Sequence, residues 1–450
     1  MLTLPIADAL SRYLDLATQQ MKLTAANMAK QNVVGYTRRS VTFAGGDSVT
    51  LSGRSGSTGV TATVRPQTDA VLQKAVWQAT EASSGSSARS AALDALQSQF
   101  ALDSDGNDSA EINSSLTGFF NAESALAAAP TDPAAMQAVL ASANRFAATM
   151  NRAASQIATQ RTSLDQQVAG AVAGVNTLAA SLASLNKQIG SAGPGVDVSA
   201  LQDQRNQVVS QLASQVDVSV TSASDGSINL SLSDGTPFVT SFQTAPLSTN
   251  LQGGVSQIYS GGRSVTSAIQ GGMLGGTLHA RDHDLPAVAA QLDAIASAFT
   301  GAVKTAQTSG MSPTSTATGT LFTGVTASSL SVSDVANQIS TGGNGSTAAA
   351  IAALSSMPLI GMLTLNGAVS SMVSGLGATA SAVATDSTAD TAVLTQTSNQ
   401  LDKRTGVSLD TEASNLTQYQ RSYQAAAKVL AIVNELMAQA INLGTGTTVS

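Results

Sequence analysis

The sequence contains no cysteine, and this absence excludes disulfide bonds, thiolate metal sites and cysteine nucleophiles. Charged residues make up only 11% of its 450 residues and aromatic residues 3%, and it has two histidines. An active site needs clustered titratable groups, and no Ser/His/Asp set, paired-carboxylate cleft or metal cluster stands out. We therefore expect a protein that is not an enzyme, with no catalytic residue, no cofactor and no metal ion.

The 28 acidic residues outnumber the 21 basic ones, which gives a net charge of -7, and the basic residues form no run or stripe. Electrostatic binding to nucleic acid or to an anionic membrane surface therefore has no visible basis. No segment has 18 uninterrupted apolar residues, and the first residues lack the basic and apolar regions of a cleaved signal peptide. These patterns predict no nucleic-acid partner and no membrane insertion, and taken alone they favour the cytoplasm.

Two short motifs invite a metal site. His279 and His283 are four residues apart, so on one face of a helix their imidazoles could share a metal ion. However, Gly275-Gly276 and Pro286 argue against a continuous helix, and the glutamate of an HExxH motif is missing. The acidic run 103–108 lacks the glycine and glutamate that an EF-hand loop has at its sixth and twelfth positions. We therefore predict an ordinary packing or surface role for the histidines and a turn for the acidic run.

Apolar residues at both ends of the chain recur at alternating three- and four-residue steps, the spacing of a narrow coiled-coil seam. One seam lies within 5–30 and the other within 406–443, where Glu412 occupies a seam position. A lone helix with such a stripe is marginal in water, so we expect the two helices to pair, within a subunit or between copies. The predicted assembly interface comprises seam residues and the turn after the first helix: Leu10, Leu14, Ala17, Met21, Met28, Gly35, Tyr36, Leu409, Leu416, Tyr419, Tyr423, Leu430, Val433 and Met437.

The middle of the chain predicts a helical rod that carries a small β region. Asp132 as N-cap and Pro133 at the first helical position begin a helix whose apolar residues keep coiled-coil spacing to about Ile189. From 216 to 239 the pattern changes to period two, with Asp-Gly turns at 225–226 and 234–235, which indicates an antiparallel meander. Further helices are predicted over 68–103, 199–212, 284–305, 347–357 and 366–403.

The expected fold class is mainly α: a long helical bundle or coiled-coil rod with its terminal helices paired, plus a small inserted antiparallel β domain. We divide the chain into three domains. Residues 1–45 with 405–450 form a terminal coiled-coil domain, residues 46–212 with 284–404 form a rod-like helical body, and residues 213–283 form the β domain.

Motifs at both ends of the chain resemble the terminal signatures of bacterial flagellar axial proteins. They are ANMA at 26–29, NVVGYTRR at 32–39 and GVSLDTE at 406–412. Interior segments are similar to the FlgK family of flagellar hook-associated proteins, namely SLTGFFN at 115–121, LQDQRNQVV at 201–209 and GGTL at 275–278. The resemblance covers nearly the whole chain and is weakest over 307–364.

The resemblance implies a structural component of the bacterial flagellum, a first junction protein that links hook to filament and polymerises through its terminal helices in an inner tube. Its implied partners are copies of itself, hook protein, the next hook-associated protein or filament side, and a cytoplasmic export chaperone of the FlgN type. It also implies export by the flagellar type III apparatus without a cleaved signal, and hence an extracellular place on the flagellum rather than the cytoplasm. The alternatives are a hook or rod subunit and a flagellum-displayed adhesin that binds a host or glycan through 253–267.

Overall fold

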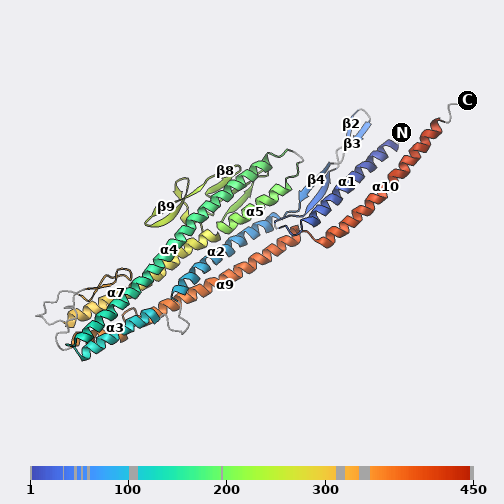
Figure 1. The fold of residues 1–450 in the computed structure, drawn as a ribbon. Coiled ribbons are helices and arrows are strands. Elements are labelled where there is room, and N and C mark those ends of the chain that lie inside the picture. Colours follow the sequence, from blue (N-terminus) through green and yellow to red (C-terminus); the bar gives the residue numbers. More distant parts are fainter. Residues whose placement is uncertain are drawn as a thin grey trace.

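The protein is an elongated, mainly helical rod whose two chain termini lie side by side at one end (Figure 1). The computed structural model describes residues 3–33, 35–44, 48–51, 54–57, 61–100, 110–193, 196–310, 320–333 and 345–445. The acidic run 103–108, for which a turn was predicted, lies outside the described residues. The fold class predicted from the sequence, mainly α with an inserted antiparallel β region, is confirmed.

The helices carry the length of the rod. They are α1 (Thr3–Ala29), α2 (Ala70–Phe100), α3 (Ala110–Ala128), α4 (Pro133–Gly190), α5 (Ser199–Gln215), α6 (Gly272–His279), α7 (Leu285–Gly310), α8 (Ser346–Ala353), α9 (Leu365–Thr405) and α10 (Leu409–Thr445). The longest of the body, α4, begins as predicted: Asp132 is its N-cap and accepts a hydrogen bond from the backbone N–H of Ala134 at 3.0 Å. Its 58 residues span about 87 Å at 1.5 Å per residue.

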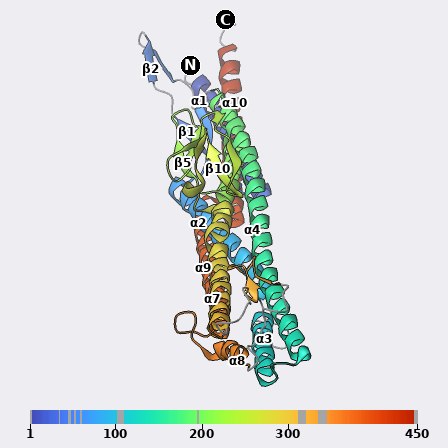
Figure 2. The same ribbon diagram turned by 90° about the vertical axis from the view of Figure 1, so that its left-hand side faces the viewer.

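The strands form small antiparallel sheets on one side of the helical body (Figure 2). The larger sheets combine β5 (Ser219–Ser222), β6 (Ile228–Ser231), β7 (Pro237–Thr240) and β8 (Gln243–Thr244), and separately β9 (Leu247–Gln252), β10 (Val255–Ser260) and β11 (Arg263–Ser264). Two-stranded ladders pair β1 (Arg39–Ala44) with β4 (Thr61–Pro66), β2 (Ser48–Leu51) with β3 (Arg54–Ser57), and β12 (Phe322–Thr323) with β13 (Ser331–Val332). The meander predicted over 216–239 is therefore present as β5–β7, with Gly226 and Gly235 at φ 82° in its turns.

Helix α4 links two separate hydrophobic cores. Its residues between 139 and 164 join the first core, built with α3, α7, α8 and α9, and those between 168 and 183 join the second, beneath the sheets. The ring of Phe299 centres the first core, 4.6 Å from Phe146 and 4.8 Å from Phe322 between ring centroids. Trp77 packs in the second core. One continuous helix thus holds both cores in a fixed relation.

Residues 272–283, which the predicted division placed in the β domain, are helical. They form α6 and a π-helical turn, Ala280–Asp284, which continues directly into α7. The glycines that argued against a helix serve close packing instead, because a Cβ at Gly276 would lie 2.0 Å from the carbonyl oxygen of Gly85 on α2. Pro286 is the second residue of α7 and directly follows the π-helical turn, where the regular hydrogen-bond ladder is already interrupted.

By length and composition alone, three helical stretches could cross a membrane: Pro133–Gly190, Gly272–Ser309 and Leu365–Gln439. In the folded chain Phe146 and Leu182 of the first stretch and Phe299 of the second pack in the two cores. The absence of membrane insertion stays a prediction of the sequence.

Glu123 is a carboxylic acid buried in the α3 part of the first core. Glu123 is 2% exposed, and burial raises the pKa of its carboxyl group from 4.5 to about 8. Because the folded chain holds this proton more tightly than the unfolded chain, the free energy of unfolding falls as pH rises between these two pKa values, by about 1.4 kcal/mol per pH unit. Glu123→Gln is neutral at every pH, so we expect it to remove this slope and to raise stability at pH 9.

Urea unfolding at pH 5 and pH 9 measures the effect. Glu111→Gln is the matched control on the same helix, because its side chain is 62% exposed. An unchanged pH slope in Glu123→Gln would show that the buried carboxyl is not the group that titrates.

Candidate assembly interface

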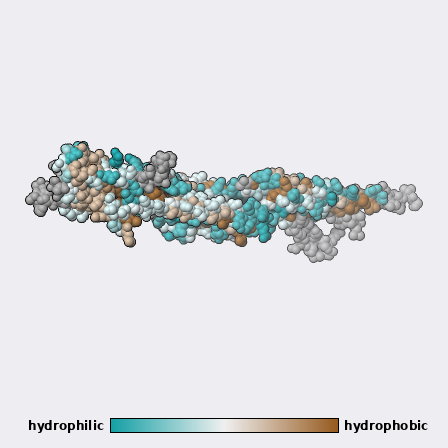
Figure 3. Space-filling view, turned by 90° about the horizontal axis from the view of Figure 1, so that it is seen from below, coloured by the Kyte–Doolittle hydropathy of each residue, from teal (hydrophilic) through white to brown (hydrophobic). Residues whose placement is uncertain are grey.

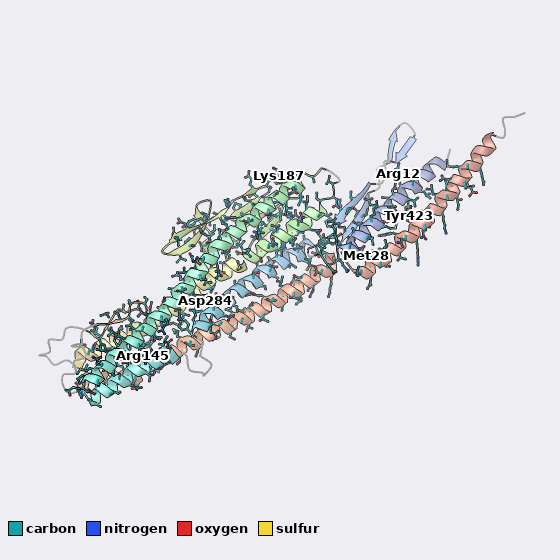
Figure 4. The ribbon with its side chains drawn as sticks, viewed as in Figure 1. Arg12, Met28, Arg145, Lys187, Asp284 and Tyr423 are labelled. Carbon is teal, nitrogen blue, oxygen red and sulfur yellow. The ribbon has the colours of Figure 1, made fainter. Side chains whose placement is uncertain are left out.

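The terminal helices α1 and α10 pack along each other and extend beyond the body (Figure 1). The seam residues of α1 are turned inward: Ala17 is 3% exposed, and Leu10, Leu14, Met21 and Met28 are half-buried. On α10 the half-buried members are Leu416, Tyr419, Leu430, Val433 and Met437. Figure 4 places Met28 at the body end of the pair, with Arg12 and Tyr423 farther out. The seam spacing thus identified the faces on which these two helices meet.

Two predicted interface residues of α10 do not lie in the intramolecular seam. Leu409 is 42% exposed and Tyr423 is 37% exposed. Three further apolar residues of the same helix, Val429, Ile432 and Leu436, are 46–57% exposed. We call these three the outer stripe. Their spacing of three and four residues places them along one face of the helix, and Figure 3 shows hydrophobic side chains at this narrow end of the molecule. The pair therefore leaves apolar surface that no described residue covers.

A polar network fixes the base of the pair to the body. Asn27 of α1 is 1% exposed and uses both ends of its amide. Its Nδ2 donates to the carbonyl oxygen of Arg39 at 2.9 Å and to Glu412 Oε2 at 3.3 Å, while its Oδ1 accepts from the Tyr36 hydroxyl at 2.8 Å and the Arg39 N–H at 3.1 Å. A buried amide with all these partners fixes α1, the following turn and α10 relative to one another.

Arg38 and Glu412 form an ion pair at the edge of this network. Arg38 Nε lies 2.6 Å from Glu412 Oε1, and the Glu412 side chain is 1% exposed. The backbone N–H of Arg38 donates to the carbonyl oxygen of Thr405, the last residue of α9, at 2.7 Å. Arg38 therefore contacts both sides of the break between α9 and α10, where Gly406 ends the first helix.

The next residues attach the same turn to α5. Thr37 Oγ1 donates to Asp203 Oδ1 at 2.6 Å, and Arg39 NH2 lies 3.5 Å from Asp203 Oδ2. The Arg39 guanidinium also lies 5.2 Å from the centre of the Tyr36 ring, within cation–π range. Burial raises the pKa of the Tyr36 phenol, which keeps it a hydrogen-bond donor to Asn27. Gly35 is exposed and has φ 80°, which only glycine adopts without strain.

The sequence analysis gave Asn27, Arg38, Asp203 and Glu412 no role, although each lies in a quoted motif or, for Glu412, at a seam position. The signal that points to them is a charged residue in an apolar seam, because a buried carboxylate needs a cation and hydrogen-bond donors. The cation that pairs with Glu412 is Arg38, which lies 374 positions away in the sequence. The spacing of residues within one helix does not reveal such a distant partner.

Comparison with known proteins supports the resemblance of the motifs. Residues 103–322 match the family described as the flagellar hook-associated protein FlgK helical domain. Residues 399–443 match the family described as the flagellar basal body rod FlgEFG protein C-terminal. The chain carries a helical domain of the FlgK family. This domain includes α3, α4, α5, the sheets of β5–β8 and β9–β11, and α7, and the C-terminal match includes α10 up to residue 443.

Among the similar proteins are three named "Flagellar hook-associated protein 1". The chain is 28% identical to the one of Salmonella typhimurium, over 49% of this chain and 40% of that protein. It is 26% identical to the protein of Escherichia coli, over 66% of this chain and 56% of that protein. It is 25% identical to the protein of Bacillus subtilis, over 75% of this chain and 78% of that protein. The match thus spans less than half the length of the Salmonella relative. A solved structure, the flagellar hook junction protein FlgK from Burkholderia pseudomallei, aligns with TM-score 0.50 and 26% identity over 55% of this chain and 46% of that one.

Proposed function

We propose that this chain is a structural subunit of the junction between the hook and the filament of the bacterial flagellum. The observation that carries the proposal is the outer stripe of α10, which lies on the paired terminal helices at one end of a long rod. A repeated contact between this stripe and the terminal helices of a neighbouring copy would bury it and build a ring or helical tube. The names of the relatives and of the similar structure support the hook junction as its place.

In this role the chain acts by assembly and carries out no catalysis. Its partners are neighbouring copies, hook protein on one side, and the next hook-associated protein or filament on the other. Before export, a FlgN-type chaperone covers the apolar residues of the C-terminal helix, and the protein then leaves the cell through the flagellar type III apparatus. The exposed apolar residues Val429, Ile432 and Leu436 give such a chaperone a surface to cover.

A hook or rod subunit is the second candidate, because residues 399–443 match the C-terminal family of rod proteins. Binding of a host or glycan through 253–267 on β10 and β11 is the third. The helical body argues for the junction over the hook or rod, because most of the chain outside its ends is α2–α9 rather than sheet.

Deletion of the gene separates these candidates. In the proposed role, electron microscopy shows hooks without filaments, and flagellin accumulates in the medium instead of on the cell. Loss of the hooks themselves would assign the chain to the hook or rod. Normal motile filaments would reject both structural roles and leave adhesion, which a binding assay on intact flagella then measures.

A further inference from the structure

His279 and His283, the two histidines of the sequence, face each other in the structure. Their ring centroids are 4.9 Å apart and both residues are exposed. The helix break expected at Gly275-Gly276 and Pro286 is absent, because α6 continues through a π-helical turn into α7. Such π-helical turns are rare and occur frequently at functional sites.

The backbone that carries the two rings is held from three sides. Arg281, between the histidines, is fully buried, and its NH1 donates to Asp165 Oδ1 of α4 at 2.8 Å and to the carbonyl oxygen of Ser256 of β10 at 2.9 Å. Asp284 receives two hydrogen bonds from Arg89 of α2, at 2.8 and 2.9 Å. Figure 4 places Asp284 inside the helical body. The imidazoles therefore project from a turn that is fixed before any ligand arrives.

Asp284 also orients one ring. Its Oδ2 lies 3.4 Å from His279 Nδ1, so a proton on Nδ1 leaves Nε2 free to bind a ligand. A histidine that binds a metal ion through one ring nitrogen usually donates a hydrogen bond from its other ring nitrogen to a carboxylate or another acceptor. His283 has no hydrogen-bond partner among the described residues. Each ring can thus present one nitrogen to a shared ion.

The space and the charge around the rings suit a cation. Both imidazoles line a cavity of about 610 Å³ together with the polar side chains of Gln257, Ser264 and Gln270. Three carboxylates, of Asp165, Asp282 and Asp284, face two guanidinium groups, of Arg89 and Arg281, so one negative charge is left in excess. An added cation therefore meets a favourable local field.

We propose that His279 and His283 bind one divalent transition metal ion, Zn²⁺, Ni²⁺ or Cu²⁺, through one nitrogen of each ring. Imidazole is a preferred ligand of these three ions. Asp282 and Asp284 are engaged by Arg281 and Arg89, and the described residues hold no cluster of three or more metal-binding side chains. Water or a small anion in the cavity completes the coordination. The site is independent of the assembly role, since it lies on the body and not on the terminal pair.

Isothermal titration of the full chain without a histidine tag, with ZnCl₂, NiCl₂ and CuCl₂ separately, tests the site. We expect one equivalent to bind, and His279→Ala and His283→Ala each to weaken binding at least tenfold. Gln252→Ala, which removes an exposed amide of β9 outside this cavity, is the control and should bind like the parent. Circular dichroism checks that the variants keep their helices. We expect them to do so, because both rings are exposed.

A second measurement keeps the outcome clear. Because no other histidine is present, the imidazole proton signals in an NMR spectrum come from this pair alone, and Cu²⁺ should broaden both signals together. Absence of binding by any of the three ions, or full binding retained after either substitution, overturns the proposal. Broadening of one signal without the other does so too.

Discussion

Arg38→Ala is expected to release the paired terminal helices from the body while leaving the body folded. The substitution leaves the Glu412 carboxylate, which is 1% exposed, without its cation at 2.6 Å. Removing one partner of a buried ion pair is strongly destabilising, and because Arg38 is itself 26% exposed we expect the lower end of that range, about 3 kcal/mol. Hydrogen exchange measured by mass spectrometry should speed up over α1 and α10 and stay unchanged over α3 and α7.

Two further variants show whether the unpaired charge is the cause. Glu412→Gln keeps an acceptor but removes the charge, so Arg38→Ala combined with Glu412→Gln should be more stable than Arg38→Ala alone. Arg12→Ala is the control, because Arg12 is an exposed arginine of α1 and takes part in no salt bridge among the described residues. If Arg12→Ala and Arg38→Ala speed exchange equally, the ion pair does not hold the joint.

Replacing Leu430 and Val433 together by Asp is expected to abolish incorporation of the chain into flagella. Both residues are half-buried in the seam of α10, and charges in a dry seam between helices are strongly disfavoured. The body should remain folded, because its two cores contain no residue of α10. Secretion with loss of filaments, seen by electron microscopy of a complemented deletion strain, is the measurement. Normal incorporation would refute the seam as an assembly element.

A second pair of substitutions separates pairing within the subunit from contact between subunits. Ile432 and Leu436 are exposed, so Asp at both positions should leave the α1–α10 pair intact in the isolated chain and still block incorporation. Met362→Asp is the control, because Met362 is 96% exposed on the body, away from the pair. Incorporation of the Ile432→Asp, Leu436→Asp variant at the level of this control would show that the outer stripe is not covered in the assembly.

Periodicity predicted the elements of this fold well, because long helices and short meanders leave local patterns. The seam in 406–443, the start of α4 at Asp132 and Pro133, and the turns of the meander all follow from residues close in sequence. The helix across Gly275-Gly276 was missed because its glycines are set by contact with α2, a distant segment. The network around Asn27 and Glu412 was missed for the same reason. Local signals give elements, whereas polar contacts across the chain decide how they are joined.

The break between α9 and α10 has a mechanical consequence. The terminal pair connects to the rod next to 35–38 and 406–408, two short non-helical segments held by the Arg38, Asn27 and Asp203 contacts. The rod beyond acts as a lever about as long as α4, so a rotation of about 5° at this joint moves its far end by roughly 8 Å. Bending is therefore concentrated at the joint between the terminal pair and the rod. The side-chain contacts at this joint, and not the helices on either side, set its stiffness.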